Sequence, residues 1–400
     1  MKPFMKTETK AVHSGDRKKN PDAPGAFVPS STPIYTATTY LYDETAKLDR
    51  VLGREEAGFC YGRYDNPTRT GLEELLTELE CGHSAQVCCS GMMALHLALL
   101  AALTDRRKSV LASNALYGST TTLLTQVLEP LGVSIDFVDT CDTAAVEQKI
   151  AETKPGCIVM ETISNPLLRV GDLDRIAELA RVAGAALIVD NTFATPLLVR
   201  PLEHGANFSV HSLTKFLAGH GDVLGGVVVT DEAHSDVTRA LSRTMGPVLG
   251  PFESFLSMRG IKTFALRVER QCANACRIAT WLRSHPRVER VHYLADPKHP
   301  DAAVIRRLLP EGLYGALVPF ELKDATKEDV FRFMDKLKLV LRGTSLGDVH
   351  SLLLYPAMAS HREIAPKQRR RMGIGDGLVR FCAGIEAVDD IIADLDQALG

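Results

Sequence analysis

One lysine of the sequence stands among residue types that could do chemistry together. Lys215 follows two hydroxyl residues, Ser212 and Thr214, and upstream of them the apolar run Ala186–Val189 ends in Asp190. Pyridoxal 5'-phosphate (PLP) requires an amine for a Schiff base, a carboxylate that keeps its ring nitrogen protonated, and donors for its phosphate. The pattern therefore indicates a PLP site. Taken alone, the lysine is better explained as an exposed surface residue and the aspartate as a cap after a strand.

Two further segments supply groups that such a site needs. Ser90-Gly91-Met92 follows a predicted strand and opens an apolar helix, and the N–H groups of a helix N-terminus form a cradle for phosphate. Ser212 would donate from the other side. Tyr117 follows another predicted strand, where its ring would stack on the pyridine. The ordinary alternatives are a simple helix cap and a surface aromatic residue.

Short apolar strands alternate with helices from residue 85 to residue 229, which is typical of a largely parallel sheet covered on both faces. In such sheets ligands bind at the carboxyl ends of the strands, where Asp190 and the turn before Lys215 lie. The predicted strands are Gln86–Cys89, Ser109–Ala112, Ser134–Val138, Cys157–Met160, Ala186–Asp190, Phe208–Val210 and Gly225–Val229. The predicted helices are Met92–Leu103, Thr120–Leu131, Thr143–Glu152 and Leu173–Ala183.

The remainder of the chain indicates an N-terminal arm and a second domain. Residues 1–62 contain many Pro, Ser and Thr residues and favour an extended or irregular arm. A large domain follows over residues 63–260, and an α+β domain over residues 261–400 begins with a connecting helix, Ile261–Ser284. Its predicted strands and helices are Val288–Tyr293, Ala302–Leu309, Ala316–Leu322, Lys327–Lys338, Leu378–Ala383 and Val388–Leu399.

Composition argues against several classes of function. The net charge of −3 gives no field that would attract nucleic acid or an anionic membrane. The nine cysteines are irregularly spaced and several lie in apolar runs, which favours reduced, buried thiols; for Cys272 and Cys276, core packing is the better interpretation than metal binding. No apolar leader or membrane-length run is seen, so we expect a cytoplasmic protein. Because the cysteines lack the spacing of metal ligands, we also expect no metal site.

Several segments taken together resemble the Cys/Met-metabolism (trans-sulfuration) family of PLP-dependent enzymes, which includes cystathionine γ-lyase, cystathionine γ-synthase and methionine γ-lyase. The resemblance runs from about Thr9 to the C-terminus. It rests on Tyr61–Thr68, Ser90–Met92, Leu116–Gly118, Glu161–Pro166, Val189–Phe193, Ser212–Phe216 and Gly219–Asp222. The fold that it implies is α/β, the aspartate-aminotransferase-like fold type I, with a mostly parallel large domain and a smaller α+β C-terminal domain.

The resemblance implies roles for residues around the cofactor. Lys215 matches the PLP lysine, Asp190 the acid on the ring nitrogen, and Tyr117 the stacking tyrosine that helps proton transfer to the leaving group. Asn165 matches the residue near the phenolic oxygen of the cofactor. The implied phosphate ligands within the subunit are Gly91, Met92, Ser212 and Thr214.

It also implies substrate and subunit contacts. Arg380 matches the arginine that binds the substrate α-carboxylate, a task for which a planar guanidinium is well suited, and Ser351 matches a nearby serine. Tyr61 and Arg63 match residues that reach into the site of a neighbouring subunit and bind its phosphate. A homotetramer built as a dimer of dimers follows from that likeness.

The implied reaction is cleavage of a carbon–sulfur bond in a sulfur amino acid. Elimination at Cγ of L-methionine, L-cystathionine or L-homocysteine would give 2-oxobutanoate, ammonia and a thiol; the alternative is γ-replacement on O-acyl-L-homoserine, as in cystathionine γ-synthase or a sulfhydrylase. His350 stands where cystathionine enzymes have a glutamate for the distal amino group of the substrate. An imidazole cannot replace that carboxylate directly, which argues against cystathionine as the substrate; the alternative is that His350 simply lines the entrance. Gly221 favours methionine γ-lyase and Ser119 disfavours it, so the substrate stays open.

Two other classes of function fit the sequence less well. A nucleotide-binding oxidoreductase would share the parallel sheet, but no Gly-x-Gly-x-x-Gly turn opens a βαβ unit. A catalytically silent scaffold of the same fold is expected to lose Lys215, Asp190 or Arg380, and all three are present.

Overall fold

Seven strands build the large sheet, in the order β1-β7-β6-β5-β4-β2-β3, in a computed structural model that describes residues 5–15, 28–359, 362 and 366–400. The strands β2 to β6 pair in parallel, whereas β7 runs antiparallel to both β1 and β6. The predicted mostly parallel α/β sheet is confirmed. The strands are β1 (Ser84–Cys88), β2 (Ser109–Ser113), β3 (Ser134–Val138), β4 (Cys157–Glu161), β5 (Ala186–Asp190), β6 (Phe208–Ser212) and β7 (Gly226–Thr230).

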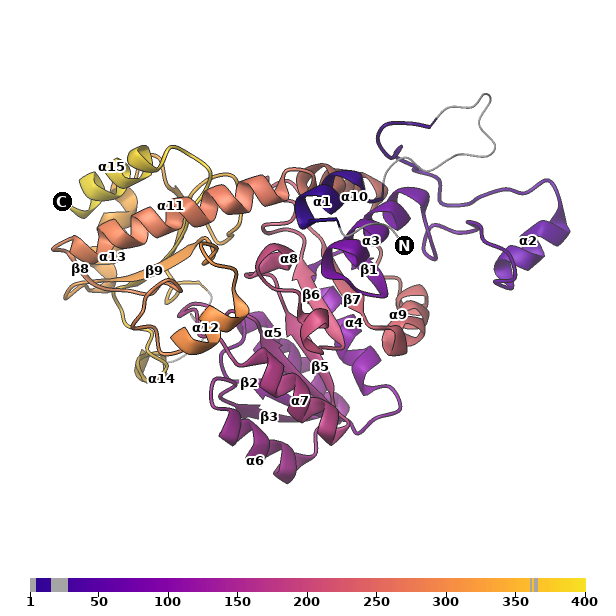
Figure 1. The fold of residues 1–400 in the computed structure, drawn as a ribbon, viewed down its shortest axis with the longest axis horizontal. Coiled ribbons are helices and arrows are strands. Elements are labelled where there is room, and N and C mark those ends of the chain that lie inside the picture. Colours follow the sequence, from indigo (N-terminus) through magenta and orange to yellow (C-terminus); the bar gives the residue numbers. More distant parts are fainter. Residues whose placement is uncertain (1–4, 16–27, 360–361, 363–365) are drawn as a thin grey trace.

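Helices cover both faces of this sheet (Figure 1). The helix α4 (Gly91–Leu103) is apolar around its circumference because it is buried beneath one face. Packing on the other face are α3 (Pro67–Glu80) and α7 (Leu173–Ala183). The remaining helices of this part are α5 (Gly118–Thr122), α6 (Thr143–Thr153), α8 (Thr195–Leu198), α9 (Glu232–Met245) and α10 (Pro251–Ile261).

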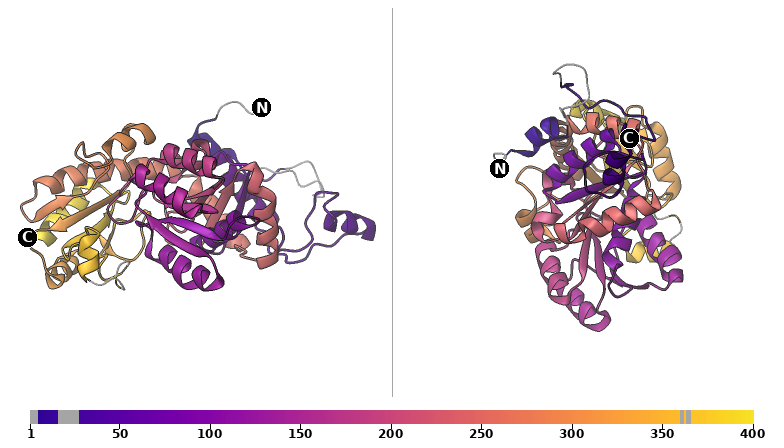
Figure 2. Two further views of the ribbon diagram at one scale, coloured as in Figure 1. Left: turned by 90° about the horizontal axis from the view of Figure 1, so that it is seen from below. Right: turned by 90° about the vertical axis from the view of Figure 1, so that its right-hand side faces the viewer.

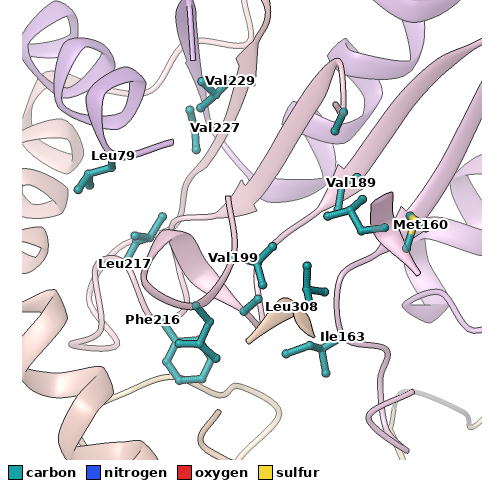
Figure 3. Close-up of a cluster of buried hydrophobic side chains, with 14 of the residues drawn as sticks. Leu79, Met160, Ile163, Val189, Val199, Phe216, Leu217, Val227, Val229 and Leu308 are labelled. Atoms are coloured by element: carbon teal, nitrogen blue, oxygen red, sulfur yellow. The ribbon is translucent and has the colours of Figure 1, made fainter. Parts of the chain in front are cut away.

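Alternation along β5 divides its side chains between two cores. Ile188 packs with α4, whereas Val189 packs with α3 and α7, as the two-residue period of a strand requires. Figure 3 shows the second of these cores, in which Val189 lies near Met160 of β4. Phe216 and Leu217, which follow Lys215, are buried in the same core (Figure 3). The backbone around the lysine is therefore anchored by packing.

The C-terminal part has its own sheet, in the order β10-β11-β12-β9-β8. Its long helix α11 (Phe264–Ser284) runs from the large sheet to this second sheet (Figures 1 and 2). The strands are β8 (Val288–Val291), β9 (Leu317–Leu322), β10 (Leu341–Arg342), β11 (Leu352–Leu354) and β12 (Leu378–Cys382). The helices that complete this part are α12 (Ala302–Leu308), α13 (Lys327–Lys336), α14 (Pro366–Arg371) and α15 (Val388–Leu399).

Several expected elements differ from the structure. The helix predicted at Thr120–Leu131 is α5 followed by a π-helical turn (Leu123–Leu128) and a short 3-10 turn, since Pro130 cannot donate a backbone hydrogen bond. The connecting helix begins at Phe264, and α10 ends at Ile261 just before it. The elements α8, α9, α10, α14, β10 and β11 were not predicted from the sequence.

The N-terminal arm and the cysteines differ from expectation in detail. The arm holds two short helices, α1 (Thr7–His13) and α2 (Thr45–Leu52), and the second lies away from the body of the molecule (Figures 1 and 2). All nine cysteines are free, as predicted. Cys272 is buried as expected, but Cys276, four residues further along α11, is exposed and does not contribute to the core.

Candidate active site

Asp190 ends β5 at the carboxyl edge of the sheet, beside Val210 of β6 and Glu161 of β4. Its Oδ1 accepts a hydrogen bond of 3.0 Å from the backbone N–H of Thr192. Burial raises the pKa of the Asp190 carboxyl, whereas the Thr192 hydrogen bonds and the nearby His211 lower it. Because desolvation disfavours the ionised carboxylate, a positively charged partner would be needed to stabilise it.

Lys215 lies three residues after the end of β6, in a turn at the same carboxyl edge of the sheet. Its Nζ donates a hydrogen bond of 2.9 Å to Ser345 Oγ. Burial lowers the pKa of the Lys215 amine, and the positive charge of Arg380 lowers it further. The amine is thus more readily neutral than that of an exposed lysine, which suits a nucleophile and a base.

Arg380 of β12 brings the second domain to this edge. Its Nη1 donates to Asn165 Oδ1 at 3.3 Å and its Nη2 to the Ser345 carbonyl oxygen at 3.1 Å. Its Nε is buried and has no hydrogen-bond partner among the described residues. Burial lowers the pKa of Arg380 to about 10. A buried guanidinium that meets only neutral oxygens within the described chain lacks a counter-charge, and an anion bound there would supply it.

The helix α4 begins shortly after β1, and its N-terminus lies against Ser212 at the end of β6. Ser90 caps the helix by accepting from the Met93 N–H at 3.1 Å. A side chain at Gly91 would meet Ser212 at 2.9 Å, so only glycine permits this close approach of helix and strand end. Met92 is the next residue of the helix, and a helix N-terminus of this kind suits a phosphate. Thr214 Oγ1 bonds both the N–H and the carbonyl of Gly225.

Glu161 joins two of the expected site residues through its carboxyl group. It accepts from the backbone N–H of Tyr117 and from the backbone of Asn165. Burial raises the pKa of Glu161 well above its ordinary value, and the charge of Asp190 adds to this effect. The loops that carry Tyr117 and Asn165 are therefore held to one buried group at the end of β4.

A cavity of about 960 Å³ opens beside these residues, between the large sheet and β12. Tyr117, Asn165 and Arg380 line it, together with Asn114, Arg169 and Thr344 among others. Lys215 is not one of its lining residues, but its hydrogen-bond partner Ser345 directly follows Thr344, which does line the cavity. The cavity has room for an amino acid with a side chain.

Of the expected site residues, only Tyr117, Asn165 and Arg380 line this cavity. Four of the others, Tyr61, Arg63, His350 and Ser351, have surroundings of their own. Tyr61 is partly exposed, and the Arg63 guanidinium lies over its ring. His350 is exposed, and its Nδ1 lies 3.2 Å from Asp348 Oδ1. Ser351 is buried, where its Oγ donates to Glu386 Oε2 at 2.9 Å.

Sequence reasoning missed two residues that matter here, Ser345 and Glu161. Both lie in segments that carried the resemblance or stood next to it, and Ser345 opens the Ser-Leu-Gly run before His350. A hydroxyl beside a glycine turn was a usable signal. The contact with Lys215 spans 130 positions of sequence, so its existence could be seen only in the fold.

Comparison with known proteins decides the family. A family model described as "Cys/Met metabolism PLP-dependent enzyme" matches residues 8–400. The chain belongs to this family. PLP is accordingly its cofactor, and the chain is a PLP-dependent enzyme with the fold type I architecture that the sequence predicted.

Individual relatives of this PLP enzyme carry several names. An L-methionine gamma-lyase from Fusobacterium nucleatum subsp. polymorphum is 37% identical and covers 98% of this chain and 97% of its own. An O-succinylhomoserine sulfhydrylase from Pseudomonas aeruginosa is 35% identical, covering 98% and 94%. A crystal structure of cystathionine gamma-lyase from Lactobacillus plantarum complexed with L-serine has a TM-score of 0.89 and 35% identity, with 98% of each chain covered.

The residues present fit PLP. Asp190 offers a carboxylate to a pyridinium at the strand ends, and the N-terminus of α4, which lies against Ser212 at Gly91, offers backbone N–H groups to a phosphate. Lys215 offers an amine whose pKa is lowered. Within the described residues, no helix is both long and apolar enough to cross a membrane, and no group of three or more His, Cys, Asp and Glu side chains could hold a metal ion.

Proposed function

We propose that this enzyme is a carbon–sulfur lyase that eliminates the γ-substituent of L-methionine, L-cystathionine or L-homocysteine, giving 2-oxobutanoate, ammonia and a thiol. The observation that carries the proposal is the buried Arg380, whose Nε lacks a partner in the described chain and whose Nη2 bonds the residue that also holds Lys215. A substrate carboxylate on Arg380 would place Cα within reach of the lysine. The names of the relatives support the same reaction class.

Each residue then has a separate task. Bound PLP would supply an electron sink for the carbon that loses its proton. Asp190 would keep the ring nitrogen protonated, and Gly91, Met92, Ser212 and Thr214 would hold the phosphate, with Asn165 near the phenolic oxygen. In this assignment Lys215 carries the proton from Cα, and Tyr117, which lines the cavity, gives a proton to the leaving sulfur.

A γ-replacement on an O-acyl-L-homoserine is the second candidate. It is supported by the likeness to the O-succinylhomoserine sulfhydrylase, which is nearly as similar as the lyase relative. Both reactions would use the same lysine, aspartate, tyrosine and arginine. They differ in whether water or a thiol captures the product, which the cavity does not decide.

Neighbouring subunits would complete the site. Tyr61 and Arg63 stand outside the cavity of their own chain and are partly exposed, so they are available to a second copy. We assign them to the PLP phosphate of the neighbouring subunit in a dimer, two of which form a tetramer. For His350 we propose a place at the entrance, since its ring is exposed.

The assignment is tested by substrate profiling of the purified holoenzyme and its Arg380→Lys variant. L-Methionine, L-cystathionine, L-homocysteine and O-acyl-L-homoserines are assayed for 2-oxobutanoate, pyruvate and thioether. We expect 2-oxobutanoate without a thiol acceptor, and a loss of about a hundredfold in kcat/KM for Arg380→Lys, because lysine cannot bind a carboxylate in two places. Arg277→Lys, in an exposed ion pair, is the matched control. Thioether formation alone would assign the replacement reaction instead.

Covalent attachment of the cofactor is checked separately. Borohydride should fix PLP to Lys215, which mass spectrometry of peptides locates, and the Lys215→Ala variant should release it on gel filtration in denaturant. A protein that retains no chromophore after incubation with PLP would contradict the assignment.

A further inference from the structure

A buried carboxylate–imidazole pair lies beneath the strand ends that carry the site. Glu80, the last residue of α3, and His211 of β6 meet through Oε1 and Nε2 at 2.5 Å. Both side chains are buried, with 0% and 1% exposed. Because Val210 packs on the α4 side, alternation along β6 turns His211 to the α3 side, below the edge where Asp190 lies.

The pair is connected to the strands on either side of Asp190. Asn191 Nδ2 donates to Glu80 Oε1 at 3.2 Å, and Thr162 Oγ1 donates to Asn191 Oδ1 at 2.7 Å. Thr162 directly follows β4 and Asn191 directly follows β5. The network therefore holds the ends of three neighbouring strands to one helix end.

Stability alone explains this pair poorly. Glu80 Oε2 and His211 Nδ1 are both buried, and neither has a hydrogen-bond partner among the described residues. Buried polar atoms without partners cost free energy, and a buried charged pair is often no more stabilising than apolar side chains of the same volume. A role in the chemistry of the site accounts for the pair better.

The charges nearby show what the pair can do. Asp190 and Glu161 are neighbours in register at the ends of β5 and β4, where Glu161 is buried and Asp190 is half-buried. Glu80 adds a third carboxyl group from α3. Lys215 and Arg380 are the cations on the cofactor side, and on the α3 side the group that acts on Asp190 is His211. Burial raises the pKa of Asp190, and the imidazole opposes that rise.

We propose that Glu80 and His211 form a positioning pair for the cofactor: Glu80 fixes the His211 ring beside the end of β5, and the pair favours the ionised carboxylate of Asp190, which would hold the proton on the PLP ring nitrogen. This inference rests on the proposed role of Asp190. His211 is a positioning residue because it acts through Asp190 and touches neither substrate nor cofactor.

The test uses His211→Gln, Glu80→Gln and the double variant, with Ser209→Ala as the matched control. Ser209 is equally buried and its Oγ lies 3.4 Å from the same Nε2, but it carries no charge. Apoenzyme is loaded with PLP labelled with nitrogen-15 in its ring, and the nitrogen chemical shift is followed against pH. The dissociation constant for PLP is measured by absorbance.

We expect the ring nitrogen of each single variant to lose its proton about one pH unit below that of wild type and PLP to bind about tenfold more weakly. The double variant should add little, because the two residues act as a unit. Ser209→Ala should behave as wild type. Folded variants whose ring nitrogen titrates as in wild type would overturn the proposal and leave the pair a purely structural one.

Two further measurements separate the possible failures. If the variants do not fold, the imidazole nitrogen signals of histidine-labelled wild-type holoenzyme decide: a neutral His211 overturns the proposal and a doubly protonated one supports it. Asp190→Asn tests the assumption beneath it. If the PLP ring nitrogen titrates in Asp190→Asn as in wild type, the proposed role of Asp190 is wrong. If its titration changes in Asp190→Asn but not in His211→Gln, only the proposed role of the Glu80–His211 pair is wrong.

Discussion

At the scale of single residues, two serines in one loop have different surroundings. Ser345 accepts a hydrogen bond from Lys215 Nζ, whereas Ser351 is buried and bonded to the Glu386 carboxylate and to the N–H of Gly384. The family likeness assigned Ser351 to the substrate. The geometry puts Ser345 in contact with Lys215 and gives Ser351 a supporting place in the fold.

Alanine variants should separate these two roles. Ser345→Ala removes a hydrogen-bond partner of the Lys215 amine and should lower kcat about tenfold, a loss of about 1.4 kcal/mol in transition-state stabilisation. Because Ser345 is only half-buried and water can replace its hydroxyl, we expect this variant to lose less stability than Ser351→Ala. Ser351→Ala leaves the buried Gly384 N–H without its acceptor and the half-buried Glu386 carboxylate short of a donor, and should cost about 1–3 kcal/mol of stability, with normal kinetics per folded molecule. Steady-state kinetics and urea unfolding of both variants check this, and the opposite pattern would restore Ser351 to the substrate site.

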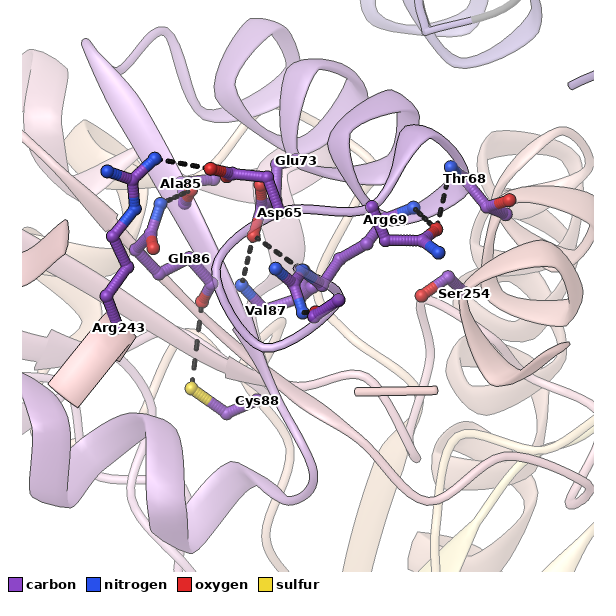
Figure 4. Close-up of polar contacts among 12 residues, drawn as sticks. Asp65, Thr68, Arg69, Glu73, Ala85, Gln86, Val87, Cys88, Arg243 and Ser254 are labelled. Carbon is purple, nitrogen blue, oxygen red and sulfur yellow. Dashed lines mark hydrogen bonds and ion pairs between the residues drawn. The ribbon is translucent and has the colours of Figure 1, made fainter. Parts of the chain in front are cut away.

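At the scale of elements, one carboxyl group joins α3 to β1. Glu73 Oε1 accepts from the Val87 N–H at 3.2 Å and lies 3.8 Å from Arg69 Nε (Figure 4). Burial raises the pKa of Glu73 from its ordinary 4.5 to about 7, although Arg69 and the Val87 hydrogen bond lower it. The contribution of this junction to the stability of the folded protein therefore depends on pH near neutrality.

The sign of this sensitivity follows from proton linkage. The folded protein holds the Glu73 proton more tightly than the unfolded chain, so the stabilisation is fully present below pH 4.5 and is lost as the pH rises through about 7. Between pH 5 and pH 8, wild type should lose about 2–3 kcal/mol relative to Glu73→Gln. Urea unfolding at both pH values measures this difference. Glu74→Gln, an exposed neighbour, is the control, and a constant difference between wild type and Glu73→Gln would contradict the prediction.

At the scale of the whole molecule, the site draws on distant parts of the chain. Lys215 and Asp190 come from the large sheet, whereas Arg380 and Ser345 come from the C-terminal part. Ile305 and Leu308 of α12 pack in the same core as the large sheet, and Asp301 pairs with Arg169 at 2.7 Å. These contacts hold the two parts together around the cavity.

The proposed exchange of residues between subunits predicts complementation. Lys215→Ala and Arg63→Ala should each be nearly inactive as pure proteins. After joint unfolding and refolding in equal amounts, about a quarter of the wild-type activity should return, because half of the random dimers contain one site with both residues intact. Activity at the sum of the two pure variants would show instead that Arg63 serves its own subunit.

What the sequence by itself determined about this protein is its local chemistry and fold class. Alternating apolar strands and helices predicted the parallel sheet, and the residues around Lys215, Asp190 and Gly91 indicated PLP, because each signal lies within a short stretch of chain. Boundaries of most predicted elements agree within a few residues. The missed β10 and β11 are too short to show a period.

Only the tertiary structure decided which of these groups meet. The contacts of Lys215 with Ser345 and of Arg380 with Asn165 join residues 130 and 215 positions apart, and the Glu80–His211 pair spans 131. Such pairs depend on strand order and on the packing of helices, which no local pattern encodes. Burial then shifts the pKa of Lys215, Asp190 and Glu161, because the dielectric surroundings of a group are a property of the folded chain.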